Sequence, residues 1–215
     1  MNNHIKKAFV LSLITIFYNI VEGLVSVYIG STDETLALFG FGVDSFVEVI
    51  SGLAIAHMIF RMKYSKVQTR DEFEKTALKV TGSSFYILTV GLIIGSILNV
   101  VQNVKPETTL PGMIIAVISI ATMYWLMKSK LAVGKALNSD AIIADANCTK
   151  TCFYLSFILL ASSGLYQIFQ IAYFDILGSL GIAYFAFKEG REAFEKVKSG
   201  NLMCSCDEHA GKFIQ

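Results

Sequence analysis

The sequence predicts an all-α, polytopic membrane protein of six transmembrane helices. Hydrophobic residues make up 54% of the 215-residue chain and charged residues only 16%, and the mean hydropathy is +0.58. Soluble globular chains rarely have such a composition. The charges gather in short stretches that leave apolar runs of roughly 20 residues between them, the length that spans a bilayer. The formal net charge of +1 gives no reason to expect a nucleic-acid partner.

Six apolar runs are expected to cross the membrane, at residues 8–30, 36–60, 78–102, 110–127, 140–165 and 169–188. The first follows two lysines, as the apolar part of a secretory signal does, but it is too long for a signal and contains Glu22. The fifth is the least apolar, because Asp145, Cys148 and Lys150 interrupt it. We therefore divide the chain into a six-helix transmembrane domain at 1–190 and a short tail at 191–215.

The basic residues predict the orientation. Sixteen of the eighteen Lys and Arg residues fall at the N-terminus, in the second and fourth loops or in the tail. Cytoplasmic loops carry an excess of these residues. Both termini are therefore expected in the cytoplasm, with short outward loops at 31–35, 103–109 and 166–167. The expected location is the cell membrane.

The tail has two parts. Residues 189–198 carry charges of both signs at i,i+3 and i,i+4 spacing, which predicts a solvated extension of the last helix without a function of its own. Beyond it, Cys204, Cys206 and His209 offer three soft metal ligands within six residues. This segment is interpreted either as a metal-binding arm or as a stretch without function.

Ionisable residues inside the apolar runs are the main functional signal, because each charge at the bilayer centre costs on the order of 2.5–3.5 kcal/mol. In the second run, Asp44 and Glu48 are four residues apart, so they lie on one face of the helix. Two carboxylates this close repel each other unless a cation or a proton lies between them. The pair therefore favours a cation site over a pair of carboxylates that are neutralised by protonation or by a lysine.

The fifth run carries a complementary set of ligands. Asp145, Cys148 and Cys152 stand at i, i+3 and i+7 and so share one stripe of the helix. Two thiolates with the carboxylates of Asp44 and Glu48 make a borderline-soft, four-ligand set that suits Zn²⁺ or Cd²⁺ better than Mg²⁺ or Ca²⁺. The alternative is that both cysteines are small apolar packing residues.

Three segments resemble the cation diffusion facilitator, or cation efflux, family: LALFGFGVDSFVEVISG at 36–52, SDAIIADANCTKTC at 139–152 and FDILGSLGIAYFAFKEGR at 174–191. They are similar to the second, fifth and sixth helices of that family. In this resemblance Asp44, Glu48, Cys148 and Cys152 occupy the metal-ligand positions. Asn19 and Glu22 resemble polar positions found in some smaller members.

The resemblance implies a homodimeric antiporter that exports a divalent metal ion in exchange for protons, without a prosthetic group and without enzymatic activity. Many members have His and Asp at the positions of Cys148 and Cys152, so the thiols shift the expected cargo toward Zn²⁺, Cd²⁺ or other soft ions. Many also have a cytoplasmic domain after the sixth helix. Only about 27 residues follow Lys188 here, so the resemblance covers the transmembrane domain alone and predicts a dimer formed through the helices.

The roles of the other buried polar residues stay open at this point. Asn19, Glu22 and Asp145 are candidates for orienting a ligand or carrying protons, and Glu22 and Asp145 are also possible partners of Lys150. Asp175 is interpreted equally well as a helix-start residue and as part of the transport path.

Two other functional classes compete with transport. One is a membrane sensor or scaffold that holds a metal permanently on the same four ligands. The other, less favoured, is a thiol oxidoreductase that uses Cys148 and Cys152, although a redox pair normally has the shorter C-x-x-C spacing.

Overall fold

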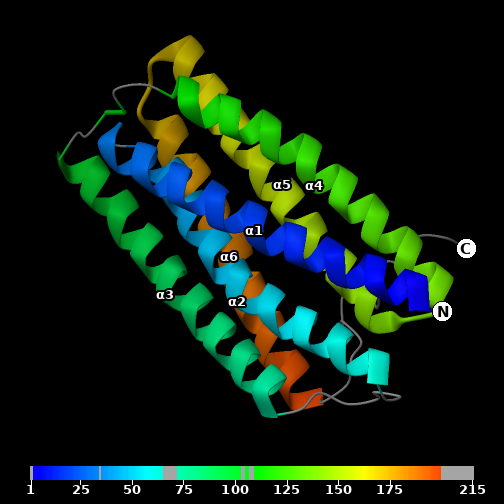
Figure 1. Ribbon diagram of the computed structural model, residues 1–215. Coiled ribbons are helices and arrows are strands. Elements are labelled where there is room, and N and C mark those ends of the chain that lie inside the picture. Colours follow the sequence, from blue (N-terminus) through cyan, green and yellow to red (C-terminus); the bar gives the residue numbers. More distant parts are fainter. Residues whose placement is uncertain (1, 34, 65–71, 103–104, 107–108, 200–215) are drawn as a thin grey trace, which may run out of the picture.

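The computed structural model describes residues 2–33, 35–64, 72–102, 105–106 and 109–199, and every regular element within them is an α-helix. The all-α, six-helix prediction is confirmed. The helices run along one another in alternating directions (Figure 1). Their bounds are α1 Asn2–Thr32, α2 Leu36–Tyr64, α3 Glu72–Gln102, α4 Leu110–Leu137, α5 Asp140–Phe169 and α6 Tyr173–Ser199.

Helices α1 to α5 are long and apolar enough to cross a membrane. Helix α6 lacks a stretch that is both long enough and apolar enough to meet this criterion. Its apolar first half is followed closely by four charged residues, Lys188, Glu189, Arg191 and Glu192. Its remaining length nevertheless packs alongside the other helices (Figure 1). The polytopic membrane architecture therefore stands, with α6 as its most polar member.

Two predicted boundaries are wrong. Helix α4 continues to Leu137, so the stretch expected as the fourth loop is mostly helical. Its C-cap, Asn138, has a left-handed backbone with φ 46°, a conformation that Asn tolerates well, and α5 begins two residues later. The last outward loop is not at 166–167, which belong to α5; the chain turns after Gln170, where φ is 56°.

The start of the predicted tail also differs from expectation. Residues 191–199 continue α6, and Glu192, Ala193 and Lys196 are buried. The expectation of a wholly solvated extension is therefore wrong for this face of the helix. The tail ligands Cys204, Cys206 and His209 lie outside the described residues.

Glycines set the closest helix contacts. A Cβ at Gly42 of α2 would lie 2.7 Å from the backbone nitrogen of Val27 in α1. A Cβ at Gly82 of α3 would lie 2.9 Å from the ring of Phe194 in α6. Small residues at such positions let transmembrane helices pack at short range. The most extensive helix contacts in the bundle are α1 with α2, α3 with α6, and α4 with α5.

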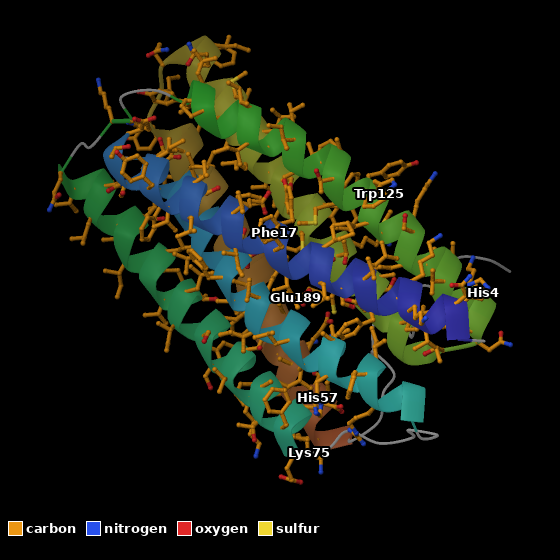
Figure 2. All side chains as sticks on the ribbon, viewed as in Figure 1. His4, Phe17, His57, Lys75, Trp125 and Glu189 are labelled. Atoms are coloured by element: carbon orange, nitrogen blue, oxygen red, sulfur yellow. The ribbon has the colours of Figure 1, made fainter. Side chains whose placement is uncertain are left out.

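The exterior is more apolar than much of the interior. Many large hydrophobic side chains face outward, including Phe17, which is 72% exposed, and Trp125 (Figure 2). By contrast, Asn19, Glu22 and Asp44 are buried. An apolar exterior around buried polar groups suits a bilayer as solvent, because intramembrane ionisable residues face the bundle interior.

Candidate functional site

A cavity of about 50 Å³ lies inside the bundle, and each of the six helices contributes side chains to its wall. Its lining comes from the middle of α1, the later part of α2, the first part of α3, the end of α4, the first part of α5 and the end of α6. In alternating helices these segments lie in the half of the bundle that contains the start of α1 (Figure 1). The basic residues predict that this half faces the cytoplasm.

Glu48 on α2 joins three helices at the cavity. Its Oε1 atom accepts a hydrogen bond from the Cys152 thiol of α5. Its Oε2 atom accepts one from the side-chain amide of Asn19 in α1 at 2.9 Å. Glu48 and Cys152, 104 residues apart in sequence, were predicted as ligands of the same ion, and the fold places them in contact.

Cys148 lies one turn before Cys152 and lines the same cavity. Its sulfur is 3.6 Å from Nζ of Lys196 in α6, and its backbone carbonyl is 3.6 Å from the sulfur of Cys152. Both cysteines are free thiols. The i,i+4 spacing therefore places them on one stripe of α5, with the Cys148 thiol toward α6 and the Cys152 thiol toward α2.

Asp44 lies apart from this contact. It is buried, it is not part of the cavity wall, and its Oδ1 atom has no hydrogen-bond partner. Across the described residues, no three His, Cys, Asp or Glu side chains are arranged to hold a metal ion together. The four predicted ligands thus form one contacting pair, Glu48 and Cys152, with the other two nearby on the same helices.

Asp145 forms an ion pair with Lys130, a residue that the sequence analysis placed in the fourth loop. Nζ of Lys130 in α4 lies 2.9 Å from Oδ1 of Asp145, and the side chains are only 3% and 7% exposed. The same ammonium group donates to the Thr149 hydroxyl at 3.0 Å. Lys150, the alternative partner, is exposed on α5, with its Nζ 5.7 Å from the ring centroid of Tyr154.

Two other predicted residues have their own partners. Glu22 accepts hydrogen bonds from the hydroxyls of Tyr18 at 2.9 Å and Ser45 at 3.1 Å, on α1 and α2. Asp175 accepts from the backbone N–H groups of Leu36 at 2.9 Å and Ala37 at 3.2 Å. Since the first N–H groups of a helix lack intrahelical partners, Asp175 of α6 caps the start of α2.

Sequence reasoning missed three charged residues of the cavity wall, namely Lys130, Glu189 and Lys196. Glu189 accepts a hydrogen bond from Thr151 at 2.9 Å, and Figure 2 shows it on the α6 ribbon within the bundle. The helical spacing of residues in this segment could have predicted that they share one buried face. Glu189, Ala193 and Lys196 stand at i, i+4 and i+7, which places them on one face of a continued helix.

Comparison with known proteins gives one result. The family model described as the cation efflux transmembrane domain matches residues 8–199. This span includes all six helices except the first residues of α1, at 2–7, and it includes the Glu189–Ser199 stretch. No curated protein matches the chain.

Proposed function

The chain belongs to the cation efflux family, and from this premise we propose that it carries Zn²⁺ or Cd²⁺ out of the cytosol in exchange for protons. Family membership makes the protein an integral, multi-pass membrane transporter of divalent cations. The proposal adds the cargo, the counter-ion and the ligands Asp44, Glu48, Cys148 and Cys152. The sequence resemblance also supports a homodimer through the transmembrane helices.

The contact between Glu48 and Cys152 carries the proposal. It brings one oxygen donor and one sulfur donor, from different helices, together at the wall of one cavity. A carboxylate and a thiolate are a borderline-soft combination that Zn²⁺ and Cd²⁺ accept readily. Hard cations such as Mg²⁺ prefer shells made only of oxygen.

The same contact supports the proposed coupling of protons to the metal. The thiol of Cys152 donates a hydrogen bond to Glu48 and so keeps its proton, whereas metal coordination requires the thiolate. A metal ion that binds both groups therefore replaces the S–H···O hydrogen bond and releases a proton. Reprotonation from the opposite side restores the hydrogen bond and favours release of the metal.

Completing the shell requires a movement within the bundle. Asp44 lies one turn from Glu48 and Cys148 one turn from Cys152, each on the same face as its neighbour. We propose that small shifts of α2 and α5 bring these two groups to a metal held by Glu48 and Cys152. Asn19, by donating to Glu48, orients the carboxylate during this change.

The test is zinc and cadmium flux into sealed vesicles that contain the purified protein, with and without a pH gradient. Asp44→Ala and Cys148→Ser should abolish gradient-driven flux. Asp33→Ala is the matched control for Asp44→Ala, because it removes a carboxylate just beyond the end of α1 and away from the cavity wall, and it should leave flux intact.

Each outcome decides between the functional classes. Flux that depends on the pH gradient and on both residues supports metal–proton exchange through this site. Binding without flux in the unmodified protein would favour the sensor or scaffold. Unchanged flux in both variants would place the transport site elsewhere in the bundle.

A further inference from the structure

Lys196 has an unusual position for a lysine near the end of a helix. It is only 6% exposed, although Lys198, two residues later in the same turn, is exposed. Its Nζ lies 3.6 Å from the sulfur of Cys148 and it lines the same cavity as Glu48 and Cys152. A lysine normally keeps its charged end in water, whereas the ammonium group of Lys196 lies at the cavity wall beside Cys148.

The backbone that carries Lys196 is held in place by α3. A Cβ at Gly190 would lie 3.2 Å from the carbonyl oxygen of Gly82, and the ring of Phe194 covers Gly82. Ala193, one turn before Lys196, is buried. Because α6 is fixed at short range here, the helix packing places the base of the Lys196 side chain beside the cavity.

The two lysines of the cavity differ in what they contact. Lys130 forms an ion pair with Asp145 at 2.9 Å, and neither residue is among the proposed ligands. Lys196 contacts the sulfur of a proposed ligand, and it shares both its helix and the cavity wall with Glu189. The ammonium group of Lys196 therefore already places one positive charge beside Cys148, and a divalent metal ion bound to Cys148 would add two more.

Resting on the proposed function, we propose that Lys196 is a tethered competitor of the metal, whose ammonium group must leave Cys148 before a metal ion can bind there. A zinc–thiolate bond is about 2.3 Å long, so a metal on Cys148 and an ammonium group at its present distance would be close neighbours. Like charges a few Å apart repel strongly in a buried site. Lys196 thus sets how much cytosolic metal is needed to load the transporter.

The flexible stem of lysine makes this displacement feasible. Four methylene groups allow the ammonium group to swing while α6 stays fixed. Lys196 lies in the last turn of α6, close to the end of the bundle. Its charged end therefore has a short route from the cavity to water.

The first experiment measures cadmium binding by the ultraviolet charge-transfer absorbance of cadmium–thiolate bonds, in detergent. The parent protein carries Cys204→Ser and Cys206→Ser, so that Cys148 and Cys152 are its only thiols. Lys196→Met should lower the Kd for Cd²⁺ about tenfold, since even partly screened like charges at this range change an equilibrium constant by such a factor. Lys198→Met, which removes the same charge from the exposed position, should leave the Kd unchanged.

A second experiment needs no substitution at Lys196. The unmodified protein is treated with an amine-reactive reagent with and without Cd²⁺, and labelling at each lysine is measured by mass spectrometry. Cadmium should increase the labelling of Lys196 several-fold, because the displaced amine becomes accessible. Labelling of Lys198 should stay constant.

The outcomes separate this inference from the proposed function. Equal or weaker cadmium binding in Lys196→Met, or labelling of Lys196 that does not respond to cadmium, would overturn the competitor role while leaving the metal site in place. If the parent protein shows no cadmium–thiolate absorbance at all, then Cys148 and Cys152 are not ligands, and both proposals fail together.

Discussion

Two carboxylates of the same cavity, Glu48 and Asp145, are satisfied in different ways. Asp145 is paired with the ammonium group of Lys130 and is almost fully buried with it. Glu48 is held by two uncharged donors, the Cys152 thiol and the Asn19 amide. A carboxylate with its own counter-ion has little to offer a metal ion, whereas one held by neutral donors keeps its affinity for a cation. The comparison supports a framework role for Asp145 and the proposed transport role of Glu48.

The largest effect is expected from breaking the Lys130–Asp145 pair. Lys130→Met leaves a buried carboxylate without its partner, which should lower the free energy of unfolding by about 3–5 kcal/mol. Denaturant unfolding in mixed micelles measures this. Lys130→Met combined with Asp145→Asn should recover most of the loss and retain metal flux, and Lys135→Met, at an exposed position, is the control. A double variant that folds but does not transport would contradict the framework role.

The next effect concerns Glu48. Glu48→Gln keeps the size of the side chain and an acceptor for the Cys152 thiol but removes the negative charge. We expect cadmium affinity to fall at least about 100-fold, because a charged oxygen ligand of a divalent ion is lost, while unfolding changes by no more than about 1 kcal/mol. Cadmium titration and unfolding of the same sample give both values. Glu195→Gln, at an exposed position, should alter neither, and retention of full affinity by Glu48→Gln would remove this residue from the site.

A smaller effect is expected at Asn19, which contacts Glu48 without being a proposed ligand. Asn19→Ala removes the amide donor from Oε2 of Glu48. Groups that orient a metal ligand typically account for about 10–100-fold in affinity, and we expect the lower end of this range. Asn99→Ala, in the last turn of α3, is the matched control. An affinity loss as large as that of Glu48→Gln would instead indicate that Asn19 binds the metal directly.

The smallest effect is expected at Asp175, a buried carboxylate that contacts only backbone in the described contacts. Asp175→Ala removes the cap from the start of α2 and should destabilise the protein by about 1 kcal/mol. Metal flux per folded molecule should be unchanged, because the cap does not touch the cavity. Loss of flux without loss of stability would give Asp175 a transport role.

The sequence alone was sufficient for the number and order of the helices, but not for all of their ends, and for the helix faces on which Glu48 and Cys152 lie. Hydropathy shows which segments are long and apolar enough to cross a bilayer. The 3.6-residue period places Glu48 on the polar face of its helix and Cys152 on the polar face of another. Neither hydropathy nor the helical period shows how neighbouring helices are rotated and shifted against each other. The choice of Lys130 over Lys150 as the partner of Asp145, and the separate position of Asp44, depend on that arrangement.

Charged segments next to apolar runs were the main source of error. The apolar run of α4 ends near residue 127, and the lysines beyond it were assigned to a cytoplasmic loop by their charge. Leu126, Lys130, Val133 and Gly134 are nevertheless buried together, at the spacing of one helix face. A periodicity test applied to the flanking segments as well as to the apolar runs identifies both this stretch and the one that carries Lys196.

The Lys130–Asp145 pair also has a consequence for how this sequence diverges among its relatives. Neutralising either residue alone leaves an isolated charge in the core, whereas neutralising both at once is far better tolerated. Selection should therefore act on the two positions jointly, so that lineages keep both charges or lose both. Correlated substitution at positions 130 and 145 would then identify proteins related to this one, even where the metal ligands themselves have changed.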